Sequence, residues 1–226
     1  MVRGKCMNTI RHLDFFDPVQ IKDPVHIIGV GAVGSHIANN LARLGIKELT
    51  IWDYDIVEDH NIPNQMFFET QLKETKTQAV KETLLQINPD IIVNIKEKYT
   101  DEELKGHVFV SVDSINIRND IYKNNRYNME LLSIYDTRIG LETGQVYTAI
   151  WSNPKQQQAL FKNSNFKKEE VETPVSACGS KLAVLPTVQM AALIATSSFI
   201  QFIKTNTLAN TILFNSFNFS IKQYSI

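Results

Sequence analysis

The segment from Val25 to Gln65 constrains the fold of this chain more than any other. It begins with four residues that favour β-structure and continues into a turn that contains three glycines. Apolar residues then recur at every third or fourth position until Gly45, which predicts one amphipathic helix that ends at a glycine. A second apolar run, residues 48–52, ends in Asp53. This order of strand, glycine turn, helix, strand and acid predicts the βαβ unit of dinucleotide-binding folds.

The glycine turn is predicted to bind a phosphate group. Glycines allow the backbone to pass close to a phosphate, and the N-terminus of the following helix favours negative charge. We expect Asp53 to accept a hydrogen bond from a ribose hydroxyl, since an acid at this distance after the glycines does so in dinucleotide-binding folds. The turn residues that we predict to contact a nucleotide are Gly29, Gly31, Ala32, Val33 and Gly34.

Composition limits the size and the environment of the protein. The 226 residues, of which 43% are hydrophobic, are enough for one sizeable core. A net charge of −1 gives no basic field for nucleic acid or for anionic lipid. The two cysteines, Cys6 and Cys178, lie outside any CxxC pair, which favours a reducing compartment and argues against structural zinc. No signal peptide is visible at residues 1–10, so we expect a cytoplasmic protein.

One long apolar stretch, residues 182–203, has the length of a membrane span. It contains Pro186, Gln189 and Gln201 together with several serines and threonines, a composition that we consider too polar for a spanning helix. We therefore predict a buried helix at residues 187–204 and no membrane partner.

The rest of the chain predicts an α/β fold with a Rossmann-like, doubly wound and mostly parallel sheet. Residues 1–23 are expected to be a lead-in with a short helix at 10–16. The periodic segments predict a helix at 75–86 and strands at 91–95, 108–112, 131–135 and 144–151, with the last strands at 211–224. Antiparallel strands are expected in the C-terminal half. The polar segment 152–176 is predicted to be a flexible loop, and the whole chain, 1–226, to be a single domain.

Two charged residues occupy positions where ligands bind in such sheets. Lys76 lies in the first turn of the helix at 75–86, where a cation opposes the helix dipole. It is either an exposed lysine or the neighbour of an anion such as a phosphate. Asp113 follows a strand and precedes a helix, where it can cap the helix or bind a metal or a ribose. Position alone does not decide between these alternatives.

With these residues placed, the chain resembles the ThiF/MoeB/HesA family of ubiquitin-activating-enzyme-like adenylyltransferases. The resemblance covers about residues 14–204 and depends on several motifs in the family's order. These motifs match Gly29 to Gly34, Asp53 to Val57, Asn61, Gln65, Lys76, Asp113 with Arg118, and Gly144 to Val146. The CxxC pairs that bind zinc in many members are missing, so the chain resembles a minimal form of the family.

The resemblance implies that the C-terminal carboxylate of a ubiquitin-like protein or peptide attacks the α-phosphate of ATP and releases pyrophosphate. It implies that Lys76 offsets phosphate charge and that Asp113 holds Mg²⁺, so ATP and Mg²⁺ are the expected cofactors. Further nucleotide contacts are expected from Asp53, Asp55, Asn61 and Gln65. Family members usually dimerise, which predicts a homodimer.

Asn64 departs from the family pattern, because the family has a phosphate-binding arginine at this position. Either another cation replaces that arginine or activity is weak or absent. The candidates are Arg11, Arg118 and Arg138, and we take Arg138 as the third catalytic residue beside Lys76 and Asp113. Cys178 is either an acceptor thiol, as in some family members, or a small core residue.

Two other functions remain open from the sequence alone. The first is a non-catalytic scaffold of the same fold, which the substitution at Asn64 allows. The second is an NAD-dependent oxidoreductase, because Asp53 also suits the ribose of that cofactor. The oxidoreductase interpretation has no use for Lys76, and the chain shows no evident substrate domain for it.

Overall fold

The computed structural model describes residues 7–164 and 182–226. Its eight strands form one sheet, and they are β1 (Val25–Ile28), β2 (Glu48–Trp52), β3 (Ile92–Lys96), β4 (Gly106–Val110), β5 (Leu131–Ile139), β6 (Thr143–Ile150), β7 (Thr211–Asn215) and β8 (Ser220–Tyr224). The order across the sheet is β3-β2-β1-β4-β5-β6-β7-β8. The first five strands in this order are parallel, and the last three are added antiparallel. The predicted fold class is therefore confirmed.

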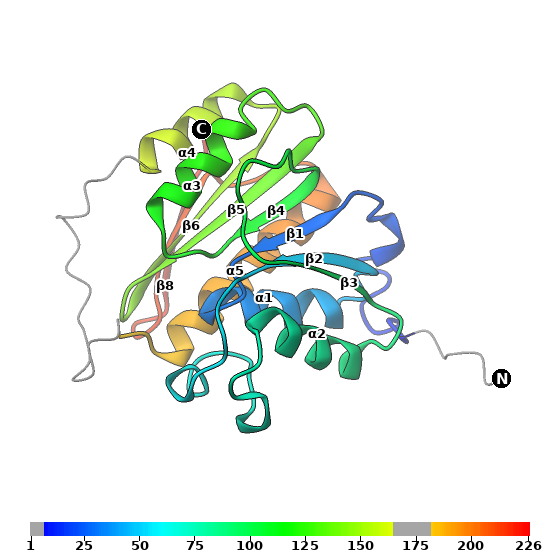
Figure 1. The fold of residues 1–226 in the computed structure, drawn as a ribbon. Coiled ribbons are helices and arrows are strands. Elements are labelled where there is room, and N and C mark those ends of the chain that lie inside the picture. Colours follow the sequence, from blue (N-terminus) through cyan, green and yellow to red (C-terminus); the bar gives the residue numbers. More distant parts are fainter. Residues whose placement is uncertain (1–6, 165–181) are drawn as a thin grey trace.

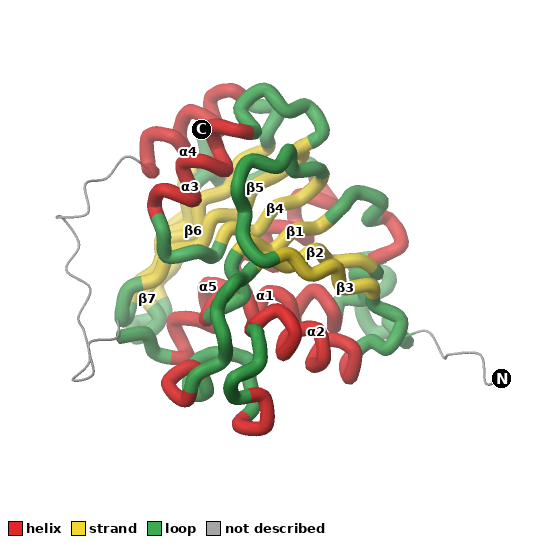
Figure 2. Tube along the Cα trace, in the orientation of Figure 1, coloured by secondary structure: helices red, strands yellow, loops and turns green. Residues whose placement is uncertain are grey.

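Helices cover both faces of the sheet (Figures 1 and 2). One face carries α1 (Ala32–Arg43), α2 (Lys76–Ile87) and α5 (Leu185–Thr205), and the other carries α3 (Ile115–Asn124) and α4 (Pro154–Ser164). Three short 3-10 helices, Pro18–Gln20, Asp59–Asn61 and Glu69–Gln71, lie in the connections. This two-sided cover is what a parallel sheet needs, since both of its faces are apolar.

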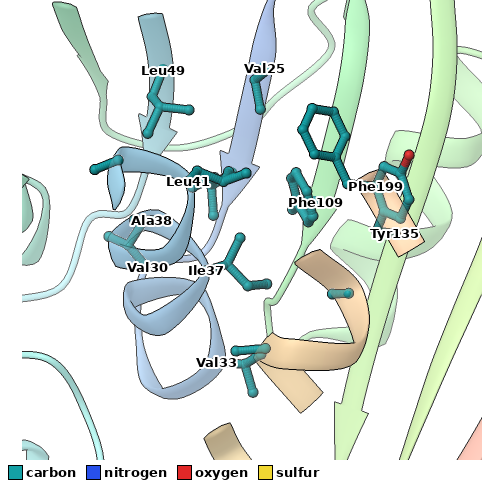
Figure 3. Packing of buried hydrophobic residues seen from close by; sticks show 14 of the residues in the cluster. Val25, Val30, Val33, Ile37, Ala38, Leu41, Leu49, Phe109, Tyr135 and Phe199 are labelled. Carbon is teal, nitrogen blue, oxygen red and sulfur yellow. The ribbon is translucent and has the colours of Figure 1, made fainter. Parts of the chain in front are cut away.

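The main core forms where α1 and α5 pack on the parallel strands (Figure 3). The apolar stripe of α1 points into it through Ile37 and Leu41, which are fully buried. Phe199 of α5 meets the edge of Phe109 on β4, with ring centroids 5.7 Å apart. Each such side chain contributes roughly 1.5–3 kcal/mol by burial. This packing fixes the N-terminus of α1 beside the end of β1.

The long apolar helix α5 belongs to this core. Its length and hydropathy are sufficient for a membrane span, so our expectation that it is too polar was wrong. However, 56% of its most apolar window is buried inside the fold, as in the core helix of a globular protein. Pro186 at its first turn and Asn206 in the left-handed conformation at its end set its limits.

Three predicted segments differ from the structure. Residues 10–15 form turns rather than a helix, with the amides of Phe15 and Phe16 donating to His12 O. The first part of the predicted loop 152–176 is helical, because α4 begins at Pro154 and the side chain of Asn153 caps it. β5 runs four residues further than the predicted end at residue 135. Residues 165–176, Cys6 and Cys178 lie outside the described residues.

Candidate functional site

The candidate site lies where the strand order reverses, between β1 and β4. From β1 the chain proceeds to β2 on one side, whereas β4 pairs on the other side. Connections therefore leave the carboxyl ends of these two strands in opposite directions, which creates a crevice in doubly wound sheets. The amide of Ser111, at the end of β4, donates to Ile28 O at 2.8 Å, so both strand ends are held together.

The glycine turn after β1 needs glycine at two positions. Gly29 has a φ of +87°, and a Cβ on it would lie 2.9 Å from the carbonyl oxygen of Ser111. A Cβ on Gly34 would lie 1.9 Å from Gly29 O, so no side chain fits there. Gly31 is different, because the nearest atom to a Cβ there is Gln65 Oε1 at 3.7 Å. The turn is therefore packed on β4 through two glycines and faces Gln65 through the third.

Asp53 connects the end of β2 to the glycine turn. Its Oδ2 accepts from the amide of Val30 at 2.9 Å, and its Oδ1 accepts from the amide of Asp55 at 2.9 Å. Burial raises the pKa of Asp53, and these hydrogen bonds and Lys76 act against that rise. Each carboxylate oxygen has a second lone pair, so Asp53 retains acceptor capacity for a ribose hydroxyl.

Lys76 is held at the start of α2 by Asp55. Its Nζ lies 2.9 Å from Asp55 Oδ2, and its amide donates to Asp55 O at 2.9 Å. The Lys76 side chain is 10% exposed, whereas that of Asp55 is 52% exposed. Thr75 caps the helix by accepting from Gln78 N. A buried cation thus lies at the site with a single half-exposed counterion, which a phosphate can displace or join.

The loop between β2 and α2 contributes three amide side chains. Asn61 is buried, and its Oδ1 accepts from the amide of Glu58 at 3.0 Å. The Nδ2 of Asn64 donates to Ala183 O at 3.0 Å, so this residue ties the loop to the segment before α5. Gln65 Oε1 is buried with no partner among the described residues, and it faces Gly31. Asn64 Oδ1 is also buried without a partner among the described residues, but only Gln65 faces Gly31, so Gln65 is placed to contact a ligand at the turn.

Asp113 lies beside the glycine turn and is exposed. The preceding residues, Ser111 and Val112, are in contact distance of the position that a Cβ would take on Gly29. The cap of α3 is Ser114, whose hydroxyl accepts from Ile117 N, so Asp113 is not used for capping. No group of three or more His, Cys, Asp or Glu residues in the described part could hold a metal. A single carboxylate still fits Mg²⁺, which usually binds one or two carboxylates together with substrate phosphates.

None of the three candidate arginines has a free guanidinium at the turn. Arg118 and Arg138 both pair with Asp136 on β5. Arg11 is exposed, and the neighbouring His12 bonds to Leu44 O at the far end of α1, about 18 Å away for twelve residues. The structure thus brings together the glycine turn, Asp53, Asp55, Gln65, Lys76 and Asp113 but not Arg138. The catalytic role of Arg138 stays a prediction that its geometry does not favour.

A hollow of about 700 Å³ lies elsewhere, between α4 and the connection from α3 to β5. Its lining includes Arg126, Tyr127, Met129, Trp151 and Phe161. It contains no residue of the predicted nucleotide site, so volume alone does not identify the site here. The glycine turn and its charged neighbours do so by chemistry.

A model of the ThiF family matches residues 22–225. Ubiquitin-like modifier-activating enzyme 5 of Arabidopsis thaliana is 45% identical over 69 residues, which are 30% of this chain and 16% of that relative. The protein of the same name from Rattus norvegicus is 46% identical over 72 residues, which are 31% of this chain and 18% of that relative. The aligned segments therefore span less than a fifth of these two relatives. These matches confirm the resemblance that the motifs indicated.

Solved structures share the fold. MccB of E. coli with ATP superposes with a TM-score of 0.70 at 20% identity, covering 92% of this chain and 65% of that chain. The Microcin C7 biosynthetic enzyme MccB in complex with N-formylated MccA gives 0.69 at 20% identity, with coverages of 92% and 66%. PaaA gives 0.71 at 16% identity, with coverages of 93% and 65%. At these identities the superpositions show a common fold.

Proposed function

Because this chain belongs to the ThiF family, we propose that it activates the C-terminal carboxylate of a ubiquitin-like protein or peptide by adenylation with ATP. One observation carries this proposal. The reversal of strand order brings the glycine turn, the buried Lys76 and the exposed Asp113 to a single edge of the sheet. These are the groups that the transfer of an adenylyl group requires.

The reaction joins two anions, so the site has to offset negative charge and align the reactants. A carboxylate oxygen of the peptide forms a bond to the α-phosphorus of ATP, and the bond from that phosphorus to the pyrophosphate oxygen breaks. No proton is removed from the attacking carboxylate, so the step needs no general base. Lys76 and the N-terminus of α1 supply positive charge from this chain.

Asp113 is the residue that would hold Mg²⁺, and a bound Mg²⁺ would neutralise charge on the phosphates. Asp53 would orient the ribose, and Gln65 would bind a phosphate oxygen at Gly31. None of the candidate arginines in the described residues places a free guanidinium at the turn, so Lys76 has to offset more of the phosphate charge than a lysine that lies beside a phosphate-binding arginine. We therefore expect turnover to depend strongly on this one ammonium.

The partner is proposed from the chemistry of the relatives. The names of the curated relatives specify ubiquitin-like modifiers, and MccB has been solved with MccA. A carboxylate at the end of a flexible chain can enter a crevice at a sheet edge, which suits either class of polypeptide. We also propose a cytoplasmic homodimer, for which the exposed Leu193 on the outer side of α5 offers apolar surface.

A second candidate is a scaffold that binds nucleotide and partner without turnover. One observation favours it, because Asn64 takes the position of the family arginine and is used to bind Ala183 O. An oxidoreductase has no such support, since it leaves the buried Lys76 and its pairing with Asp55 without a role.

Exchange of labelled pyrophosphate into ATP tests the proposal directly. Purified protein with Mg²⁺ is given peptides that end in Gly-Gly, and nucleotide and NAD⁺ binding are followed by calorimetry. Peptide-dependent exchange is the expected result. Binding of ATP without exchange for any peptide would favour the scaffold, and binding of NAD⁺ in place of ATP would contradict the assignment of the site.

A further inference from the structure

A buried charged cluster lies next to the candidate site, on the face of the sheet that α3 and α4 cover (Figure 1). We call it the Asp136 cluster, and it consists of Asp136, Arg118, Arg138 and Tyr122. Asp136 is 0% exposed. Its Oδ1 pairs with Arg118 Nη1, and its Oδ2 accepts from Arg138 Nη2 at 2.7 Å and from the Tyr122 hydroxyl at 2.7 Å. Two of the three candidate arginines are thus bound to one carboxylate.

Arg118 continues from this cluster to the backbone that carries Asp113. Its Nη2 donates to the carbonyl of Val112, the residue immediately before Asp113, and to Thr137 O at 3.0 Å. The Arg118 side chain is 6% exposed, so it has no access to a nucleotide. Its guanidinium therefore joins the turn after β4 to the strand β5 and to a fixed acid at the same time.

The side chain of Thr137 strengthens the same connection. Its hydroxyl lies 3.1 Å from Ser111 Oγ and donates to Val110 O at 3.3 Å. The regular strand β4 ends at Val110, before Asp113. These side-chain contacts hold the three residues that precede Asp113 against β5.

We propose that Arg118, fixed by Asp136, is a positioning residue that aims the carboxylate of Asp113 at the metal on the nucleotide. This inference deepens the proposed function and depends on it. A planar guanidinium with a fixed fork of donors can hold a carbonyl and a carboxylate in one arrangement, whereas a lysine ammonium cannot. A carboxylate that supplies one ligand to Mg²⁺ needs such support, because Mg²⁺ demands nearly ideal octahedral geometry.

Arg118 remains charged in this setting. Burial lowers its pKa to about 10, and Tyr122 and Asp113 oppose that change. The cluster therefore pairs two guanidinium groups with the single carboxylate of Asp136.

Calorimetry with an α,β-methylene analogue of ATP tests the inference without turnover. Affinity is measured with and without Mg²⁺ for the wild type, for Arg118→Lys and for Tyr122→Phe. We expect Mg²⁺ to strengthen wild-type binding at least tenfold, and we expect Arg118→Lys to lose most of this gain while its Mg²⁺-free affinity stays within twofold. Tyr122→Phe is the matched control, because it removes a bond to Asp136 without touching Arg118, and it should keep the gain.

A second variant tests the same inference if Arg118→Lys does not fold. Arg118→Met combined with Asp136→Leu removes this ion pair, which folded proteins often tolerate, while Arg138, whose side chain is 18% exposed, keeps its hydrogen bond to Asn163 O. It leaves Val112 O without its donor, so it should lose the Mg²⁺ gain as well. Thermal melts of all variants establish that the proteins are folded.

The outcomes separate the inference from the function. A folded Arg118 variant that keeps the full Mg²⁺ gain would overturn the positioning role alone, and so would equal weakening with and without Mg²⁺. A wild type that binds the analogue with no gain from Mg²⁺ would also overturn it. A wild type that binds no analogue under either condition would overturn the proposed function and this inference with it.

Discussion

Two ion pairs at the same edge of the sheet differ in almost every respect. Lys76 and Asp55 form a pair in which the carboxylate is half-exposed and has one cation beside it. Arg118 and Asp136 form a pair in which both side chains are buried. Nη2 of Arg118 donates to two backbone carbonyls, and Oδ2 of Asp136 accepts from Arg138 and Tyr122. The first pair can change partners, whereas the second pair cannot do so without opening the core.

This difference distinguishes a side chain that contacts the ligand, Lys76, from a side chain that holds another site residue in place, Arg118. A cation with a half-exposed counterion loses little interaction free energy when a phosphate binds, because the counterion can be hydrated instead. A buried pair whose partners are all within the fold loses several bonds at once if it opens. We therefore assign to Lys76 a direct role in offsetting phosphate charge and to Arg118 a role in positioning Asp113. Four predictions test this distinction.

The largest effect is expected for the buried pair. Asp136→Ala should reduce the free energy of unfolding by about 3–5 kcal/mol, because Arg118 is left charged and unpaired inside the protein. Urea unfolding followed by circular dichroism measures this loss. Asp120→Ala, an exposed acid on α3, is the control. A loss below about 1 kcal/mol for Asp136→Ala, within the range of a surface pair, would show that the pair is not structural.

The next effect concerns catalysis. Lys76→Ala should reduce peptide-dependent pyrophosphate exchange by about 100-fold or more, as the loss of one preorganised charge does. Its melting temperature should stay close to that of the wild type, since Asp55 can become hydrated. Lys81→Ala on the same helix is the control and should exchange normally. Exchange that persists in Lys76→Ala would remove Lys76 from the catalytic residues.

The acid sensitivity of the fold should come from buried histidines rather than from either pair. Burial lowers the pKa of His26 and of His107 to about 4. The folded protein favours their neutral forms. The contribution of these histidines to the free energy of unfolding is therefore fully present above pH 6.5 and is lost as the pH decreases from about 6.5 to 4. The expected slope is about 1.4 kcal/mol per pH unit for each histidine.

His107→Gln tests this origin, because a glutamine side chain can still bond to the Ser133 hydroxyl, which lies 2.8 Å from the histidine Nδ1. Urea unfolding at several pH values should show a smaller slope than the wild type between pH 6.5 and 4, because His107 is removed from the histidines whose pKa burial lowers, which also include His26 and His36. An unchanged slope would place the proton uptake on other groups.

The smallest effect is expected for the open pair. Asp55→Ala should change the free energy of unfolding by about 0–1 kcal/mol, because a half-exposed pair contributes little. The same urea experiment as for Asp136→Ala measures it. If Asp55→Ala were as destabilising as Asp136→Ala, the distinction between the two pairs would be wrong.

The sequence predicted most of the fold because local patterns carry it. The glycines, the helical period of α1 and the acid at the end of β2 specify one βαβ unit, and the alternation after Gly144 specifies an antiparallel strand. α4 was missed because its polar Lys and Gln residues conceal its one apolar side at Leu160. Asn153 and Pro154, a helix cap followed by a proline at the first position, were the signal that could have revealed it.

The site could be predicted only in part, since pairing depends on strand length. We predicted a strand that ends at residue 135, which would leave Arg138 outside the sheet and free to reach a phosphate. β5 continues to Ile139, so Asp136 and Arg138 lie two apart on one strand and share a face, where they pair. No local pattern shows that Arg118, on a separate helix, turns inward to the same acid. The motif placed Lys76 and Asp55 in the site, but only the fold revealed that they pair with each other and that Arg118 pairs with Asp136.

The most direct test of the proposed adenylation follows an oxygen atom. A peptide that ends in Gly-Gly and carries ¹⁸O in its C-terminal carboxylate is incubated with ATP, Mg²⁺ and the protein, and the adenylate is released with hydroxylamine. Attack on the α-phosphate predicts AMP that contains ¹⁸O, because one carboxylate oxygen leaves with the phosphate when the acyl carbon is attacked. Unlabelled AMP, or ADP with inorganic phosphate as the products, would contradict adenylation of the peptide.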